Sequence, residues 1–364
     1  MSEKEDFDAF TRANGLGRRE DIENYPDVPA APQYEMTRQV AQELIDSARL
    51  QYPGLGPIHF DFINNPHIGA WAFRLNNGYG IGLTSGTLIL VGMVFHYMLS
   101  TRSLFPRIGL PDAERSSLPP IPWDVLNAET LYGDGVMPVA PLGRERSLYA
   151  LHLTHQALNF LVGHELAHIT RGHVDYLQNN SGCRFAEGIG WSGTKDTQLI
   201  RQALELDADS RSVLARIASA HNTFHKNPNG MKPEWANEEL SILDWHFDWA
   251  FAVSTVFRLF GDRRFRKEDL LDSYPPFPVR QLQALRFACT QMAQPESTAS
   301  THVWQFLKYS AEQVEHAYTS INGLPSEGGF AQASEDATIL HLEAIKGVWS
   351  NLRKDIQTHS LESL

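Results

Sequence analysis

The sequence predicts an α+β fold that is mostly helical, with a small antiparallel sheet near the N-terminus of its main domain. Short apolar segments lie between residues 58 and 83, and Asn76-Asn77-Gly78 gives a hairpin signal among them. From residue 147 onward, apolar residues recur mainly at helical spacing. We therefore expect a sheet-containing region followed by packed helices.

Composition divides the chain into three parts. Residues 1–33 are charged and then proline-rich, which indicates a flexible N-terminal arm. Residues 34–290 are expected to form the main domain, with a long proline-rich loop at 101–148. Residues 291–364 are expected to form a helical region packed on that domain.

The first half of the main domain is predicted to hold two helices with three strands between them. Thr84 or Ser85 is placed to cap the second helix, because either hydroxyl can accept a hydrogen bond from the first helical turn. The predicted ranges are 34–50 for the first helix, 58–63, 68–73 and 79–83 for the strands, and about 84–99 for the second helix.

The loop at 101–148 contains seven prolines and little periodicity. A loop of this length is functional or disordered, so a lid over a cleft and a surface excursion are both open. Beyond it, the pattern predicts helices at about 147–176, from 198 onward, and at about 234–260, 279–292, 301–319 and 334–356, with a glycine-rich loop at 179–195.

Residues 164–168 read His-Glu-Leu-Ala-His within an apolar, proline-free run. In a helix, His164 and His168 project from one face, where two imidazoles can bind one Zn²⁺. Glu165 can then reach a water on the metal and act as general base. The five residues predict a catalytic zinc site, and a helix with two unconnected histidines is the alternative.

A catalytic zinc site needs a third protein ligand. A histidine six residues beyond His168 would suit one known design, but Val174 stands there. His173 is one residue short, and a continuous helix would turn it away from the metal. Glu205 supplies an anionic candidate on a later predicted helix.

Two aspartates lie close to that candidate ligand. Asp209 is one helical turn beyond Glu205, so it is placed to hydrogen-bond a metal-binding imidazole and fix its tautomer. Asp207 leaves the helix on another face, and we expect it to be a surface charge.

His-Glu-x-x-His followed by Glu-x-x-Ala-Asp resembles the CAAX prenyl protease and HtpX-type family of gluzincin metallopeptidases. The second motif is formed by Glu205, Ala208 and Asp209, and His173 also fits the family pattern. The segments 65–73 and 80–88 are similar to the strand pair and helix that precede the zinc helix in this family. The resemblance implies a zincin-like fold.

Downstream, Ser273-Tyr274-Pro275-Pro276 and Arg280 resemble a family stretch with Ser-His-Pro and a later arginine, although Tyr274 replaces the histidine. We expect a zinc-dependent endopeptidase acting on a dedicated protein or peptide substrate. Tyr274, Arg280 and His221 are candidate oxyanion donors by residue type, and Tyr274 is preferred. A substrate strand is expected to pair beside Gly69, Ala70 and Trp71.

Composition excludes some partners. The net charge of −12 argues against nucleic acid, which requires a basic face. The most apolar stretch, 81–99, carries glycines and polar residues, so it predicts a buried helix rather than a membrane span. The N-terminus lacks a basic, apolar leader, and Cys183 and Cys289 are the only cysteines, which favours a cytoplasmic protein with reduced thiols.

Two other functions stay open on the sequence. One is a binding or regulatory module with a vestigial zinc site, and the other is a zinc hydrolase that acts on a substrate other than a peptide. The presence of Glu165 argues against the module with a vestigial zinc site, because a purely structural metal site needs no general base.

Overall fold

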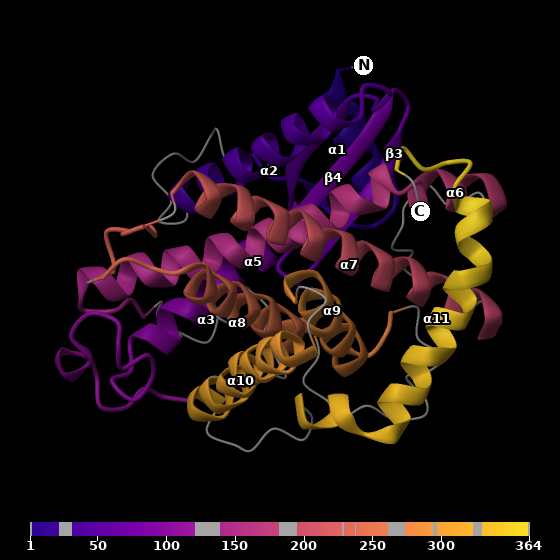
Figure 1. Cartoon of the computed structure of the whole chain (residues 1–364). Coiled ribbons are helices and arrows are strands. Elements are labelled where there is room, and N and C mark those ends of the chain that lie inside the picture. The colour runs from indigo at the N-terminus through magenta and orange to yellow at the C-terminus, as the bar shows by residue number, and fades with distance from the viewer. Residues whose placement is uncertain are drawn as a thin grey trace.

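The computed structural model describes residues 2–21, 31–120, 139–181, 195–227, 229–236, 238–260, 274–293, 297–322 and 330–362. A four-stranded sheet lies at one end, and helices pack around one long central helix, α5 (Arg144–Thr170) (Figure 1). The prediction of a mostly helical α+β fold with a small sheet is confirmed.

The sheet has the strand order β1-β2-β4-β3, with β1 at Arg18–Arg19, β2 at Ile58–Asn64, β3 at Ala70–Leu75 and β4 at Gly78–Thr84. β3 and β4 form the predicted antiparallel hairpin, but β2 and β4 are parallel. The sheet is therefore mixed rather than wholly antiparallel. The reason is that the chain leaves β2, forms the outer strand β3 first, and returns to place β4 between them.

The N-terminal residues form a docked helix where a flexible arm was expected. Helix α1 (Glu3–Ala13) begins at a capping box in which the Ser2 side chain and Glu5 bond each other's backbone N–H. Phe7 and Phe10 are buried against Trp71 and Phe73 of β3. The expectation failed because the free energy gained by burying these two rings on the sheet is enough to dock the helix, although its other side chains are mostly charged. Residues 22–30 of the expected arm lie outside the described residues.

The opposite face of the sheet packs on the main helical core, which contains Ala70 and Ala72 of β3. Thr84 caps the helix after β4, as predicted, by accepting a hydrogen bond of 3.0 Å from the Thr87 N–H. The remaining helices are α2 (Ala31–Gln51), α3 (Ser85–Leu99), α6 (His173–Ser181), α7 (Lys195–Lys226), α8 (Ile242–Phe260), α9 (Phe277–Met292), α10 (Ser297–Asn322) and α11 (Asp336–Ile356), with short 3₁₀ helices at Pro111–Ala113 and Phe330–Ser334.

The described part of the proline-rich loop is fixed at the start of α5. The buried Arg146 guanidinium donates hydrogen bonds to five backbone carbonyls of residues 99–108. Arg146 precedes His164 by 18 residues, or about 27 Å along the helix. These loop residues therefore do not cover the predicted metal site, and residues 121–138 lie outside the described residues.

The predicted helix at 147–176 is in fact two helices. α5 ends at Thr170, and Gly172 turns the chain with a φ of +78° before α6 begins at His173. A side chain at position 172 would lie 2.5 Å from the backbone of His359, so both the conformation and the close approach require glycine. The break changes the direction in which His173 points.

Within the described residues, no helix is long and apolar enough to cross a membrane. Cys289 is half-buried and forms no disulfide with another described residue, and Cys183 lies outside the described residues.

Candidate metal centre

Two helices bring three potential metal ligands together. His164 and His168 extend from α5, and Glu205 extends from α7, which packs along it (Figure 1). The two histidine Nε2 atoms are 3.0 Å apart, and each lies 3.3–3.4 Å from a carboxylate oxygen of Glu205. Zinc with bonds of about 2.0–2.1 Å has ligand atoms about 3.3 Å apart in a tetrahedron. The three donors therefore have the spacing that one zinc ion requires.

The chemistry of the three donors also fits a metal ion. His164, His168 and Glu205 are all buried, with at most 3% of each residue exposed. Among the described residues, Oε2 of Glu205 makes no hydrogen bond, and its nearest polar neighbours are Nε2 of His164 at 3.3 Å and Nη1 of Arg280 at 3.7 Å. A buried carboxylate oxygen without a hydrogen bond is costly, and a cation would satisfy it. Two imidazoles and one carboxylate leave a fourth tetrahedral position for substrate or water.

A buried aspartate supports the first histidine. Asp209 Oδ1 lies 2.9 Å from Nδ1 of His164, and Arg280 of α9 binds Asp209 through two hydrogen bonds of 2.8 and 2.9 Å. Burial alone would raise the pKa of Asp209, but the charges and hydrogen bonds of Arg280 and His164 together outweigh it and hold that pKa below its usual value. Asp209 is thus anionic and lies beside Nδ1 of His164, whereas Nε2 of the same ring faces Glu205.

The candidate base lies beside these residues. Glu165 is 1% exposed, and the backbone N–H of Ala72 in β3 donates a hydrogen bond to its carboxylate. Burial raises the pKa of Glu165 to about 7, although the neighbouring His164 opposes the shift. Its Oε2 accepts no hydrogen bond from any residue that the structure describes. A carboxyl group with a pKa near neutrality can both accept and return a proton.

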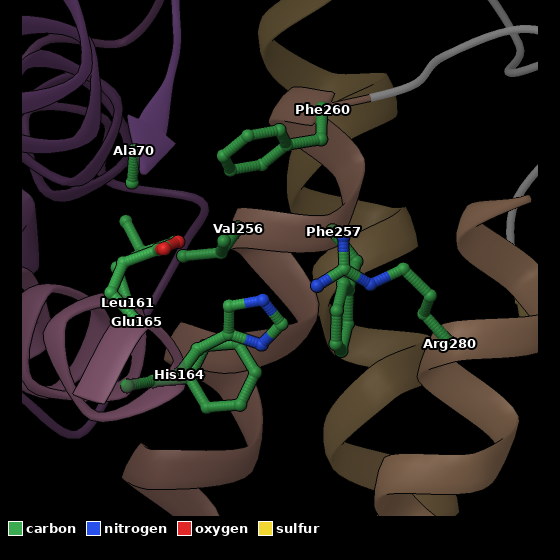
Figure 2. Close-up of a pocket in the computed structure, with 9 residues that line it drawn as sticks. Ala70, Leu161, His164, Glu165, Val256, Phe257, Phe260 and Arg280 are labelled. Carbon is green, nitrogen blue, oxygen red and sulfur yellow. The ribbon is translucent and has the colours of Figure 1, made fainter. Parts of the chain in front are cut away.

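Figure 2 shows the small cavity that Glu165 and His164 line, with the Arg280 guanidinium over Phe257 on its far side. Its volume of about 20 Å³ is enough for one water molecule. The end of α8 closes the cavity with Val256, Phe257 and Phe260 (Figure 2). A peptide has no room there, so its binding requires these side chains to move.

The outer edge of the sheet faces this cavity. The Gly69 carbonyl accepts a hydrogen bond from Thr84, and the ladder alternates from there, so Gly69 and Trp71 direct their backbone groups toward β4. Trp71 also packs its ring on the α1 side of the sheet. Of the three residues predicted to pair with a substrate, Ala70 alone directs its backbone to the free edge. Ala72 does the same, as its bond to Glu165 shows.

His173 and Asp207 were expected to lie away from the metal site, but both lie close to the candidate ligands. His173 is buried, and its Nδ1 is 3.0 Å from Nδ1 of His168. Asp207 contacts Nε2 of His173 at 3.2 Å and is bound by Arg171, so it is not a surface charge. The expectation for His173 failed because it assumed an unbroken helix through Gly172. The expectation for Asp207 failed because Arg171 and His173 lie against the face on which it leaves α7. The His-x-x-x-x-His spacing was the available signal.

The three predicted oxyanion donors lie in different places. Arg280 lines the cavity, whereas His221 is exposed on α7. Tyr274 is 37% exposed and is not among the described residues that line the cavity. The preference for Tyr274 over Arg280 is therefore not supported by the geometry.

Part of the chain matches a known protein family. Residues 32–186 match the model of peptidase family M48. The resemblance to a family of zinc metallopeptidases is thereby confirmed. The M48 match covers less than half of the chain; it includes the sheet strands β2–β4 and both histidines but ends before Glu205. No curated protein and no solved structure matches the chain.

Proposed function

We propose that this M48-like chain is a zinc-dependent endopeptidase of the gluzincin type, with His164, His168 and Glu205 as its metal ligands. The observation that carries the proposal is the triangle of 3.0–3.4 Å between their donor atoms, buried beside Glu165. The M48 match supports the peptidase activity, and the glutamate ligand rests on the geometry alone.

When bound, zinc lowers the pKa of water toward neutrality and polarises a carbonyl group. Glu165 borders the cavity that has room for one water molecule. In its ionised form it removes a proton from that water as the oxygen attacks the scissile carbonyl carbon. It then transfers the proton to the amide nitrogen that leaves, so the same carboxyl group acts as base and acid.

The rest of the proposed site orients the reactants. The free edge of β3 at Ala70 can add a substrate segment as a further strand through backbone hydrogen bonds. Arg280 lines the cavity, so it replaces Tyr274 as the favoured donor to the developing oxyanion. We further propose that the enzyme is cytoplasmic. We also propose one dedicated protein substrate, because a cavity of about 20 Å³ leaves no room for indiscriminate binding of peptides.

Metal analysis tests the ligand assignment. Wild-type protein loaded with zinc and dialysed is expected to retain about one ion per chain, whereas His164→Ala and Glu205→Ala retain almost none. Asp196→Ala is the control, because Asp196 is an exposed carboxylate on the same helix as Glu205. Full zinc retention in Glu205→Ala contradicts the gluzincin arrangement.

Comparing the proteomes of cells that express the wild type and Glu165→Gln tests the endopeptidase assignment and identifies the substrate. New protein termini that appear only with the wild type are expected. If the two proteomes have the same termini while the Glu165→Gln protein keeps the biological effect of the wild type, the chain is a binding module instead.

A further inference from the structure

The second histidine of the metal centre has an unusual neighbour. Because Gly172 reverses the chain after α5, His173 folds back and places its ring against His168. Their Nδ1 atoms are 3.0 Å apart, and both rings are fully buried. The Trp349 ring of α11 covers His173 edge-on, with 6.1 Å between the ring centroids. The position of this imidazole is therefore fixed by packing as well as by its polar contacts.

The proton positions on these two rings follow from the metal site. If Nε2 of His168 binds zinc, its Nδ1 carries the proton and must donate it. The acceptor at 3.0 Å is Nδ1 of His173, so the proton of neutral His173 resides on Nε2. That Nε2 faces Asp207 Oδ2 at 3.2 Å. The contacts thus run from the ligand through His173 to a buried carboxylate, the last of them at ion-pair distance.

We propose that His173 and Asp207 are positioning residues that hold His168 in the tautomer and orientation needed to bind zinc. This inference rests on the proposed function. Asp207 is itself fixed by Arg171, whose Nε and Nη2 each donate a hydrogen bond of 2.7 Å. The arrangement parallels the other histidine ligand, where Asp209 contacts His164 directly and is held by Arg280.

This chain of contacts continues to residues near position 360. Arg171 Nη1 lies 3.5 Å from Glu362, and the Thr170 hydroxyl donates a 2.9 Å hydrogen bond to the same carboxylate. The backbone N–H of Leu361 also donates to the carbonyl of Thr170. The segment after α11 therefore holds the end of α5 in place, two residues beyond His168.

The inference is tested by zinc affinity, measured in competition with a chromophoric chelator. His173→Ala and Asp207→Ala are expected to bind zinc about 10- to 100-fold more weakly than the wild type. His341→Ala is the matched control, because His341 is a buried histidine on α11 whose Nε2 lies 2.7 Å from Gln202 Oε1. Its zinc affinity is expected to stay within about twofold of the wild-type value.

A rescue variant separates positioning from general destabilisation. In His173→Asn, the amide oxygen can occupy the place of Nδ1 and still accept the proton of His168. This variant is expected to bind zinc more tightly than His173→Ala. The visible spectrum of the cobalt-substituted protein should move away from that of the wild type in His173→Ala and remain closer to it in His173→Asn.

Wild-type affinity in His173→Ala, or equal losses in the alanine and asparagine variants, would overturn the inference. A wild type that binds no zinc would instead overturn the proposed function. If His173→Ala does not fold, His173→Asn and Asp207→Ala still test the inference, because each keeps part of the series of contacts from His168 to Asp207. Equal zinc affinity of the wild type and Asp207→Ala then contradicts a positioning role.

Discussion

Asp209 contacts the ring nitrogen of His164 that points away from the proposed metal position, at 2.9 Å. Because a donor Nδ1–H leaves Nε2 free as a ligand, this contact selects the metal-binding tautomer. Asp209→Ala is therefore expected to weaken zinc binding by about 10- to 100-fold. Chelator competition measures the effect, and Asp196→Ala serves as the control. Unchanged affinity in Asp209→Ala would show that the aspartate only pairs with Arg280.

Glu165→Gln is expected to keep the fold and bound zinc while activity falls. The amide cannot accept the proton of the attacking water, and loss of a general base typically costs on the order of 10² to 10⁴ in rate. Zinc content and turnover of the identified substrate should be measured on the same preparation. Near-normal turnover by zinc-loaded Glu165→Gln argues that another group is the base.

Arg280→Lys is expected to destabilise the protein even though the charge is retained. A lysine cannot reproduce the two parallel hydrogen bonds that Arg280 makes to Asp209. Removing the partner of a buried charge costs about 3–5 kcal/mol, and lysine should recover part of that loss. Urea unfolding of the metal-free proteins is expected to rank wild type above Arg280→Lys and both above Arg280→Ala. Equal midpoints for all three would exclude a stabilising pair.

The metal-free protein is expected to lose stability as pH rises. Burial gives Glu165 a folded-state pKa of about 7, above the ordinary glutamate value of 4.5, so the folded state binds the proton more tightly. The contribution of this group to the free energy of unfolding therefore falls from about pH 4.5 through about pH 7. Glu165→Gln stays neutral, so it should raise the melting temperature at pH 8 and have a smaller effect at pH 5. Thermal unfolding in chelator measures this, and an equal effect at both pH values contradicts the assignment.

Phe260→Ala is expected to increase kcat/KM for the identified substrate. Phe260 lies at the end of α8 and, with Val256, closes the cavity beside Glu165 (Figure 2). Truncation of this ring removes part of the barrier to entry of a peptide. Tyr309→Ala is the control, since Tyr309 is an exposed aromatic residue on α10 that does not line this cavity. A decrease specific to Phe260→Ala indicates that the ring contacts the substrate instead.

Local patterns predicted most of the elements. The three strands, the Thr84 cap and the helices on both sides of the metal centre depend on periodicity and on turn or capping residues close in sequence. Local patterns did not predict β1 or the break between α5 and α6, and they missed α1, whose charged surface hid two aromatic residues. Its docking on β3 depends on partners more than sixty residues away, which no local pattern encodes.

The sequence by itself determined the candidate zinc chemistry, because the spacing of His164 and His168 puts them on one face of a helix, and Glu165 is the next residue round it. Glu205 and Asp209 were also accessible, since their own spacing is helical. Only the tertiary structure decided which partners support these residues. Arg280, Asp207, His173 and Glu362 reach the site through helix packing and the turn at Gly172. Contacts of this kind depend on how whole elements meet, and residue spacing along one helix does not specify that.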